Sequence, residues 1–273
     1  MSRTSETLCL QSIEYIAGVI DGDGNFDIRV ENNVRKLKAI RVKLHIRDVR
    51  ILSKVKNILR CGRLNYNKHL VTWIVSNQSD MTRIICLLNG HIRLKMLGFL
   101  EACKYFNIEP KKVQYCLLSG STYLHGLIDT DGSVTYNYSS NRIEIHLELK
   151  KTIYSDKLNL SQVIPNATVR VNHFIKRNQT QNKIYYSIRF SFDTVHNMIH
   201  LYTFIMTYRL FSDLKFYRIS QIPTFLQIRH YKNQPKASFE HRIFSKWVIR
   251  FISYLNPKYT KISYLDQLTL INV

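Results

Sequence analysis

Two short acidic segments of the sequence carry the residue types of a metal site. Residues 21–24 read Asp-Gly-Asp-Gly and residues 129–132 read Asp-Thr-Asp-Gly, so their last acids, Asp23 and Asp131, lie 131 − 23 = 108 positions apart. The apolar runs before them repeat at the same offset, as an internal duplication predicts. Each run is expected to form a helix, and a carboxylate at the negative C-terminal end of a helix is disfavoured unless a cation is present. The pattern therefore predicts two aspartates delivered to one cation.

A glycine stands inside each apolar run, at Gly18 and Gly126. A glycine in a helix interior costs about 1 kcal/mol relative to alanine, so its repetition indicates close approach of another backbone. We therefore expect the two helices to pack side by side. Without a metal, the two aspartates brought together in this way would repel each other, and one of them would tend to stay protonated.

Simpler explanations of the acidic segments were weighed against a metal site. Asp-x-Asp-Gly also occurs in turns, and a single copy would favour an ordinary helix–turn–strand connection. An EF-hand calcium loop requires glycine at its sixth position and glutamate at its twelfth. The first copy has Phe26 and Asn32 there, and the second has Val134 and Ser140. Two copies at one offset, each followed by the same strand order, make a shared site the better interpretation.

The composition favours a nucleic-acid-binding protein. The 273 residues carry a formal net charge of +21 at pH 7, and 45% of them are hydrophobic and 12% aromatic. A folded, aromatic-rich chain with this excess of basic residues is most simply a nucleic-acid binder. No apolar stretch approaches the roughly 20 residues of a membrane span, and neither a terminal basic amphipathic helix nor a lipidation motif occurs. We therefore expect no membrane partner.

Cysteine usage and coding bias give weaker indications. The five cysteines are scattered and form no Cys-x-x-Cys pair, so we expect neither zinc nor a disulfide framework, and a reducing compartment. The N-terminal residues lack a signal-peptide pattern. The abundance of Ile, Asn, Lys, Tyr and Phe indicates AT-rich coding, from which we expect an organellar protein of a mitochondrion or chloroplast.

Hydrophobic periodicity predicts the same order of elements in both halves. The first half is expected to contain a helix over 9–20, strands around 26–30 and 40–46, a helix from 49, strands near 63–66 and 70–75, and a broken helical stretch over 81–106. The second is expected to contain a helix ending at 128, strands around 133–137 and 142–150, a short helix before Pro165, strands over 169–174 and 184–192 joined by a polar loop over 176–183, and a helix over 196–208.

The predicted organisation has four parts. Residues 1–108 form a first repeat, 109–116 a linker, 117–231 a second repeat and 232–273 a basic C-terminal helical extension. Between positions 207 and 261 the sequence has eleven Lys and Arg against two acids. An amphipathic helix is expected after Pro235, and docking on the protein with a solvated basic face is a better interpretation of it than a dedicated DNA contact.

Residues 16–24 and 124–132 resemble the signature of the LAGLIDADG homing endonucleases in their single-chain, two-motif form. The first copy differs from that signature only conservatively, whereas His125 replaces a small residue in the second. The resemblance implies an α+β fold of two pseudo-symmetric αββαββα repeats. Each repeat would carry a four-stranded antiparallel sheet forming a DNA-binding saddle, and the motif helices would join the repeats. A monomer is expected, because the duplication supplies internally what a homodimer would otherwise supply.

The resemblance also implies an active site. Asp23 and Asp131 would bind a divalent metal, Mg²⁺, with the backbone carbonyls of Gly22 and Thr130. The family also places a lysine after the second hairpin of each half, a place that Lys95 fits well and Lys215 less closely.

A further polar residue, often glutamine in the family, belongs at the end of the second strand. This residue is not obvious in the present sequence, where Arg47 and Lys150 are the candidates. Metal and lysine together would stabilise the extra negative charge of phosphodiester hydrolysis.

The outward rows of the predicted strands supply the candidates for DNA recognition. A β-ribbon fits the major groove, where Arg, Lys, Asn and Gln side chains can contact base edges. For any single residue a solvated sheet face is an equally good interpretation, but the basic row as a whole favours DNA. The candidates are Arg29, Arg41, Lys43, Arg142, His146, Arg170, Asn172, Lys183 and Arg189.

Two functions follow from the resemblance, and a third does not need it. The first is a site-specific, metal-dependent endonuclease that makes a double-strand break with short 3′ overhangs in a long asymmetric target of double-stranded DNA. The second is an intron RNA-binding maturase on the same fold. Both motif aspartates and Lys95 favour retained cleavage, since a degenerate maturase is expected to lose an acid. A basic DNA-binding protein without catalysis would leave the paired aspartates unexplained.

Overall fold

The first half of the chain folds around a four-stranded antiparallel sheet in the order β1-β2-β4-β3. The computed structural model describes residues 9–178 and 183–269. The elements of the first half are α1 (Leu10–Asp23), β1 (Gly24–Glu31), β2 (Val34–His45), α2 (Val49–Leu59), β3 (Arg63–Tyr66), β4 (Leu70–Val75), α3 (Gln78–Leu88) and α4 (Met96–Tyr105), with a 3₁₀ turn over Ile46–Asp48.

The second half repeats the sheet in the order β5-β6-β8-β7. Its elements are α5 (Tyr123–Thr130), β5 (Gly132–Asn137), β6 (Arg142–Lys150), β7 (Arg170–Asn178), β8 (Lys183–Phe192), α6 (Val195–Thr207), α7 (Asp213–Ser220), α8 (Ile222–Ile228) and α9 (Phe239–Ser253). 3₁₀ turns cover Ser155–Lys157, Arg229–Asn233, Tyr259–Lys261 and Leu265–Gln267. The predicted α+β architecture with two four-stranded antiparallel sheets is confirmed.

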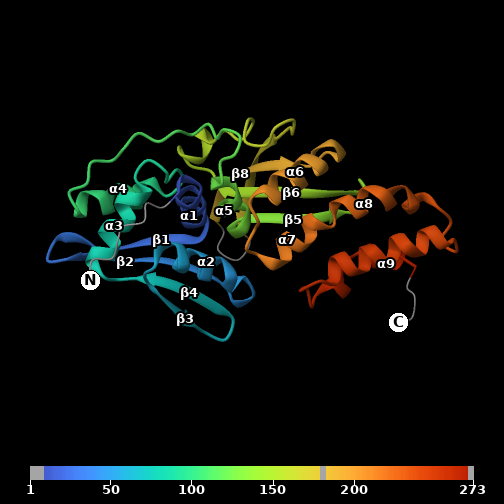
Figure 1. Cartoon of the computed structure of the whole chain (residues 1–273), viewed down its shortest axis with the longest axis horizontal. Helices are drawn as coiled ribbons and strands as arrows, with labels where there is room; N and C mark the ends of the chain where they lie inside the picture. The colour runs from blue at the N-terminus through green and yellow to red at the C-terminus, as the bar shows by residue number, and fades with distance from the viewer. Residues whose placement is uncertain (1–8, 179–182, 270–273) are drawn as a thin grey trace.

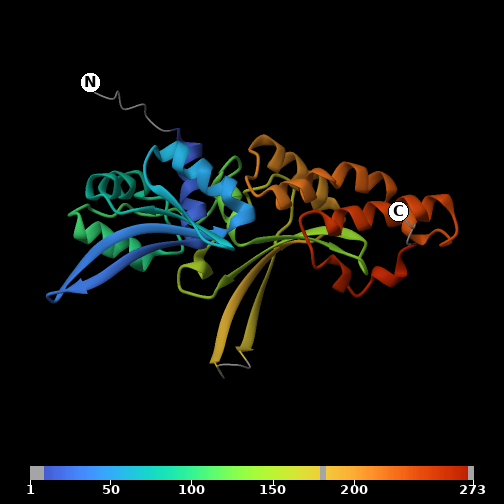
Figure 2. The same cartoon turned by 90° about the horizontal axis from the view of Figure 1, so that it is seen from below.

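Alternating apolar side chains attach each sheet to its helices. Ile143, Ile145, Leu147 and Leu149 of β6 are all buried, as the period-two pattern predicts. Helices α1 and α5 lie side by side between the two sheets (Figure 1). The hairpins β1–β2 and β7–β8 project from the same side of the molecule (Figure 2). In Figure 2, β1–β2 points to the left and slightly down, whereas β7–β8 points down. None of the described helices has both the length and the apolar character needed to cross a membrane.

The first hairpin differs from its prediction in two ways. Period-two alternation places Val30 on the same face as the buried Phe26, but its side chain is 65% exposed because the hairpin extends beyond the helices that cover the sheet (Figure 2). The β1–β2 register also shifts after Asp27, which pairs with Ala39, whereas Ile28 pairs with Leu37. The extra residue is a β-bulge, which bends the strand and which apolar alternation alone does not predict.

The second half corrects two predictions between its inner strands. The short helix expected before Pro165 is wrong, since the fully described segment between β6 and β7 has one 3₁₀ turn and no α-helix. The loop expected over 176–183 is too long, because β7 continues to Asn178 and β8 begins at Lys183. The residues between these strands lie outside the described part of the chain.

The C-terminal extension docks on the second sheet through aromatic side chains. Helix α9 begins at Phe239, four residues after Pro235, and Trp247 stacks on Phe225 of α8 with ring centroids 4.7 Å apart. Tyr136 of β5 contacts Trp247 edge-on at 5.9 Å. Phe239, the first residue of α9, has an exposed side chain. The extension is therefore built into the core, as its docked-helix interpretation predicted.

Candidate active site

Two glycines bring the backbones of α1 and α5 together. A Cβ placed on Gly18 would lie 2.1 Å from the carbonyl oxygen of Tyr123, and one on Gly126 would lie 2.3 Å from that of Tyr15. Real Cβ atoms do not approach backbone oxygens this closely, so a larger residue at either position would push the helices apart. The contact extends to the C-terminal ends of the helices, where a Cβ on Gly22 would meet the Thr130 side chain at 2.0 Å.

His125 occupies the position equivalent to Ala17 without opening this contact. Its imidazole is fully buried and lies against Phe204 of α6, with ring centroids 4.2 Å apart. The ring nitrogen Nε2 lies 3.3 Å from the Phe204 carbonyl oxygen. Burial lowers the pKa of His125 to about 4, which keeps the ring neutral at physiological pH. The larger side chain therefore packs outward against α6, while the glycine contact with α1 stays close.

Asp23 and Asp131 lie together at the C-terminal ends of the paired helices. Desolvation and, after it, the nearby negative charge of Asp23 raise the pKa of Asp131 to about 6, against the lowering effect of Lys95 and Lys215. The pKa of Asp23 is also raised, again mainly by desolvation. A carboxylate pair of this kind repels itself and is stabilised by a cation.

The first aspartate of each motif holds the lysine-bearing segment of its own half, a role that the sequence interpretation missed. Buried Asp21 accepts hydrogen bonds from the backbone N–H groups of Arg93 and Lys95, at 2.6 and 2.8 Å. It also accepts one from the Tyr123 hydroxyl of the other half, at 2.7 Å. Asp21 thus ties the segment that carries Lys95 to both motif helices.

The second half repeats this arrangement with the partners exchanged. Buried Asp129 accepts from the backbone N–H groups of Phe211 and Ser212, each at 2.9 Å, and from the Tyr15 hydroxyl at 2.8 Å. Tyr15 and Tyr123 therefore cross the interface in opposite directions. The signal was present in the sequence, because Tyr15 and Tyr123 share the 108-residue offset of the aspartates (123 − 15 = 108).

The structure brings both predicted lysines to the ends of the motif helices. Lys95 Nζ donates to the carbonyl oxygen of Gly22 at 2.6 Å and also to that of Gly24. Lys215 Nζ donates to the carbonyl oxygens of Ile128, Asp129 and Thr130 at 2.8, 2.7 and 2.9 Å. Desolvation lowers the pKa of both ammonium groups, and the surrounding aspartates oppose that shift.

The oxygen atoms at the adjoining C-terminal ends of α1 and α5, here called the metal corner, fit a hard divalent cation. Asp23 is close enough to raise the pKa of Asp131, and the carbonyl oxygens of the preceding residues, Gly22 and Thr130, each keep a second lone pair beyond the one that a lysine uses. Within the described ranges, 9–178 and 183–269, no group of three or more His, Cys, Asp or Glu side chains is close enough to hold a metal. The protein thus offers two carboxylates and backbone oxygens, and a bound phosphate would add further oxygen ligands.

The structure distinguishes between the candidates for the further polar residue. Lys150 lines a hollow of about 310 Å³ together with Asp131 and Lys95. Arg47 instead pairs with Asp48 at 3.3 Å. Asp48 precedes α2 but makes no capping hydrogen bond, and its carboxylate accepts from the Ser212 hydroxyl at 2.7 Å. Its charge raises the pKa of Asp23, so Asp48 adds a third carboxylate near the first corner.

The outward face of the first sheet carries free and paired basic side chains. Asp27 pairs with Arg41 at 2.6 Å and with Arg29 at 3.0 Å, and these pairs lower its pKa. Lys43 is exposed and lies on the same face of β2 as Arg41. This face therefore combines a fixed arginine pair with a lysine that is open to a ligand.

The outward face of the second sheet is more fully paired. Glu144 is buried and binds Arg142 at 2.6 Å and His146 at 3.0 Å. Glu148 binds Arg189 at 2.7 Å and also Lys176, and the two cations lower its pKa to about 2 despite desolvation.

The other candidates of the second sheet lie on β7 and β8. Arg170 pairs with Asp193, and Asn172 lies opposite Arg189 in the register. Lys183 begins β8, and its side chain lies outside the described residues.

Comparisons with known proteins agree with this architecture. Residues 16–106 match the family model described as LAGLIDADG endonuclease. A stretch of 152 residues is 21% identical to the intron-encoded DNA endonuclease aI3 of Saccharomyces cerevisiae and covers 47% of this chain and 37% of that protein. A stretch of 129 residues is 26% identical to the intron-encoded RNA maturase bI4 of the same yeast and covers 46% of this chain and 19% of that protein. The chain thus spans less than two fifths of the length of either relative.

A solved structure shares the fold over almost the entire chain. The LAGLIDADG homing endonuclease I-GzeII, determined in complex with a DNA target, aligns with a TM-score of 0.53 and 13% sequence identity. The alignment covers 93% of this chain and 96% of that one. The two chains therefore have the same two-sheet fold, including the second half, which lies beyond the matched family model.

Proposed function

The chain belongs to the LAGLIDADG endonuclease family, and we propose that it is a site-specific, metal-dependent DNA endonuclease. The observation that carries the proposal is the meeting of Asp23 and Asp131 at a glycine-only helix contact, with one lysine beside each. Nothing about helix packing requires two carboxylates at this point. Desolvation, with the charge of Asp23, raises the pKa of Asp131, and a cation bound between the carboxylates would offset the part of this cost that the lysines leave.

The carboxylates and the carbonyl oxygens of Gly22 and Thr130 would hold a divalent cation such as Mg²⁺. When bound, this cation supplies Lewis-acid stabilisation and a water of lowered pKa. Lys95 and Lys215 would place positive charge next to a phosphate seated at the helix ends, where negative charge develops during hydrolysis. The backbone hydrogen bonds to Asp21 and Asp129 would hold the lysine-bearing segments in position.

Each half would act on one strand of the duplex. Two corners related by the pseudo-twofold suit two phosphates that face each other across the minor groove, which gives a double-strand break with short 3′ overhangs. The projecting hairpins β1–β2 and β7–β8 have the shape that enters a major groove (Figure 2). Their outward residues differ between the halves, so the target would be asymmetric.

Acids on the sheet faces would sharpen base recognition. Asp27, Glu144 and Glu148 hold arginines in fixed positions on the outward faces. A fixed guanidinium can contact the edge of a guanine with less loss of side-chain entropy than a free one. We therefore assign direct base contacts first to Arg41, Arg142 and Arg189, and backbone contacts to Lys43, which is exposed and has no ion pair with the described residues.

The similarity to the maturase bI4 makes intron RNA binding the second candidate function. Two features favour DNA cleavage over this alternative: both motif aspartates are present, and both lysines reach the helix ends. Single-stranded RNA is read by stacking of splayed bases on open aromatic rings, whereas the outward sheet faces carry mainly charged pairs.

The remaining features of the proposal concern organisation and origin. We propose that residues 1–108 and 117–231 act as the two repeats, joined by 109–116 and extended by 232–273, in a monomer. An intron-encoded, organellar gene is consistent with the intron-encoded yeast relatives.

The proposal is tested with a target recovered from a randomised duplex library by binding to the full chain. We expect Mg²⁺ to cause cleavage of both strands with 3′ overhangs, and chelation by EDTA to abolish it. Undiminished cleavage in EDTA would contradict the metal site. Tight binding of structured intron RNA without DNA cleavage in Mg²⁺ would favour the maturase instead.

A further inference from the structure

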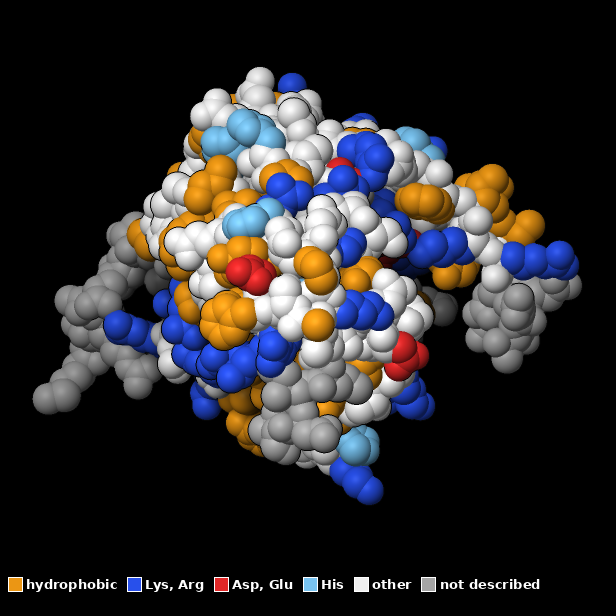
Figure 3. All heavy atoms as spheres, turned by 90° about the vertical axis from the view of Figure 1, so that its right-hand side faces the viewer, with side chains coloured by type: hydrophobic (Ala, Val, Ile, Leu, Met, Phe, Trp, Pro, Cys, Tyr) orange, Lys and Arg blue, Asp and Glu red, His pale blue; other side chains and the backbone are white. Residues whose placement is uncertain are grey.

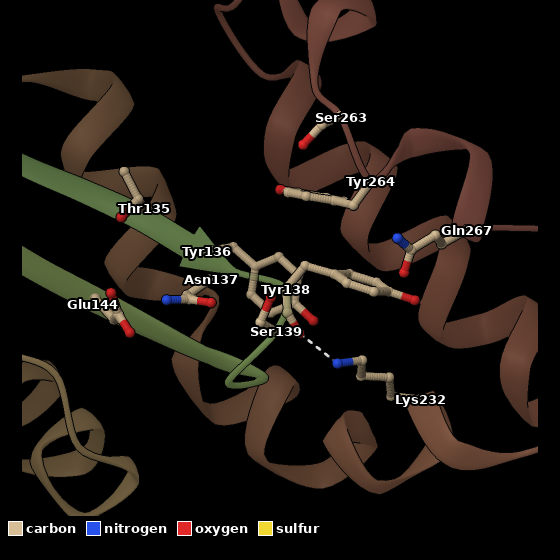
Figure 4. Close-up of a pocket in the computed structure, with 10 residues that line it drawn as sticks. All are labelled: Thr135, Tyr136, Asn137, Tyr138, Ser139, Glu144, Lys232, Ser263, Tyr264 and Gln267. Carbon is tan, nitrogen blue, oxygen red and sulfur yellow. Dashed lines mark hydrogen bonds between the residues drawn. The ribbon is translucent and has the colours of Figure 1, made fainter.

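A polar hollow of about 640 Å³ lies at the end of the β5–β6 hairpin, where the C-terminal segment reaches the second sheet. Thr135, Asn137 and Glu144 contribute from the outward face of the sheet, and Ser263, Tyr264 and Gln267 contribute from the C-terminal segment. Figure 4 shows these two groups on opposite sides of the Tyr138 ring, with Lys232 approaching from a third side. The first half has no counterpart of this segment, because the C-terminal extension follows only the second repeat.

The position of the hollow relative to the metal corner is set by one strand. Strand β5 begins at Gly132, directly after Asp131, and ends at Asn137. Five residues of strand span about 17 Å at about 3.3 Å per residue. That length corresponds to about five base pairs of B-DNA. A duplex lying along the outward face of the second sheet would therefore reach the hollow well away from the cleavage point.

The lining has the chemistry of a phosphate contact. Hydroxyl, amide and ammonium groups supply hydrogen-bond donors, and such groups make most contacts to the nucleic-acid backbone. Lys232 Nζ donates to the Tyr138 carbonyl oxygen and, as an ammonium group, retains further protons for another acceptor. The Gln267 side chain makes no hydrogen bond to the described residues, so its amide is free to donate.

One acid in the lining does not oppose an anion strongly. Glu144 is bound by Arg142 at 2.6 Å, by His146 at 3.0 Å and by the Ser140 hydroxyl at 3.2 Å. Its negative charge is therefore compensated by these neighbouring side chains. The surrounding end of the molecule is strongly basic, with scattered Lys and Arg side chains and few acids (Figure 3).

The aromatic rings in the hollow favour a duplex backbone over an unpaired base. Tyr264 stacks on Tyr138 with centroids 4.9 Å apart and an interplanar angle of 12°. The Lys232 ammonium lies over the same Tyr138 ring at 4.2 Å from its centroid. Tyr138 therefore lies between a ring and a cation and offers no open face to a base (Figure 4).

From these observations we propose that the hollow binds the phosphodiester backbone of duplex DNA at the outer end of the second half-site. Lys232, Gln267 and Tyr264 would supply the donors. Because the segment exists in one half only, the protein would cover more DNA on the second side of its cleavage point than on the first. This inference rests on the proposed function, since it assigns an additional contact to the same DNA ligand.

The test uses the full chain and two duplexes that contain the recovered target. One duplex extends about ten base pairs past the outer end of the second half-site, and the other stops about four base pairs from the cleavage point on that side. Lys232→Ala should weaken binding to the long duplex about five- to tenfold and reduce the slope of log K against log salt by about 1, as for one lost phosphate contact. Binding to the short duplex should not change.

Two further variants separate the proposal from a folding defect or a general loss of charge. Gln267→Ala removes a side chain without hydrogen bonds in the described structure and should also weaken only the long duplex, about two- to threefold. Lys261→Ala removes an exposed lysine of the same segment outside the hollow and should affect both duplexes equally and slightly. A thermal melt of each variant checks that the fold is retained.

The inference is overturned if Lys232→Ala and Gln267→Ala bind both duplexes as the unmodified protein does, or weaken both equally. It is also overturned, in favour of RNA, if the variants lose affinity for a structured intron RNA and keep it for the long duplex. Failure of the proposed function would be seen in a different measurement. The unmodified protein would then not cleave the recovered target duplex in Mg²⁺, whatever the binding of the variants.

Discussion

The two lysines of the candidate site reach the motif helices from different elements. Lys95 lies in the loop before α4, and its amine binds one carbonyl in the last turn of α1, that of Gly22, and the carbonyl of Gly24 just past the helix. Lys215 lies within α7, and its amine binds three carbonyls of the last turn of α5. In the second half the lysine therefore stabilises the helix end itself, as a cation at the negative end of a helix dipole does.

This difference shows which part of the duplication the chemistry constrains. Tyr, Gly and both Asp residues of the motif helices keep the 108-residue offset, whereas the two lysines are 215 − 95 = 120 positions apart. The helix contact tolerates little change because backbone meets backbone there. The lysines need only deliver an amine, so the elements behind them could diverge.

The largest expected effect is common to both halves. Asp23→Asn and Asp131→Asn each remove one negative charge from the paired carboxylates and should slow cleavage by about 10²–10³-fold or more. Binding of the duplex in Ca²⁺ should persist, because removal of a negative charge does not weaken phosphate contacts. Cleavage rates on the recovered target measure the effect. Full activity of either variant would contradict the shared site.

The two lysine variants should differ in how much stability they cost. Lys95→Ala is expected to reduce cleavage about 10²-fold with less loss of stability than Lys215→Ala, because only one carbonyl of the last turn of α1, that of Gly22, loses its donor. Lys215→Ala should reduce cleavage and also lower the free energy of unfolding by about 1–3 kcal/mol, because three helix-end carbonyls lose their donor. Urea unfolding of both variants provides the comparison. Equal destabilisation would contradict the distinction.

Each of the two tyrosines that cross the interface should affect the strand that the other half cuts. Tyr15 belongs to the first half but donates to Asp129, which holds the segment before Lys215. One of the two strand nicks should be slowed most by Lys215→Ala. Tyr15→Phe should slow that same nick about three- to tenfold. Tyr123→Phe should slow the nick that Lys95→Ala slows most, because its hydroxyl donates to Asp21. Strand-specific labelling of the duplex measures both nicks.

These two tyrosine variants also serve as controls for each other. Each removes one buried hydroxyl from the same type of contact, so a general loss of stability would be similar in both. If both variants slow both nicks equally, the crossed arrangement positions nothing specific.

The smallest expected effect is on the pH dependence of stability, and it comes from His125, which occupies the position equivalent to Ala17. Because the folded-state pKa of His125 is about 4, the unfolded chain takes up a proton below its ordinary pKa of about 6.5 while the folded chain does not. His125 therefore makes the folded state less stable as pH falls from about 6.5 towards 4, by about 2 kcal/mol between pH 7.5 and 5. His125→Ala should abolish this contribution, whatever its effect at pH 7.5.

Urea unfolding at the two pH values checks the histidine prediction, with Ala17→Gly as a matched control at a position that does not titrate. The difference between pH 7.5 and 5 should shrink in His125→Ala and stay unchanged in the control. An unchanged pH difference in His125→Ala would show that the buried ring contributes no proton linkage.

Sequence periodicity predicted the elements that local patterning determines. The strands β3 and β4 and the alternation of β6 followed from apolar residues at every second position. The bulge after Asp27 and the missing helix before Pro165 did not, because both depend on how one segment packs against another. Helices α7 and α8 were also missed, since neither has a long periodic stretch.

The candidate site was predictable to the extent that it is duplicated. Asp23, Asp131, Gly18 and Gly126 stood out because they repeat at one offset. The place of the Asp48 carboxylate and the crossed tyrosine contacts could not be predicted from the sequence, because residues far apart in the chain meet there.

The central claim, that one carboxylate from each half holds a shared metal centre, is tested most directly by anomalous diffraction. Crystals of the full chain with its recovered duplex would be grown with Mn²⁺, whose anomalous signal marks metal positions. The account predicts Mn²⁺ in contact with the carboxylates of both Asp23 and Asp131. Metal bound elsewhere, or held by the residues of one half alone, would contradict it.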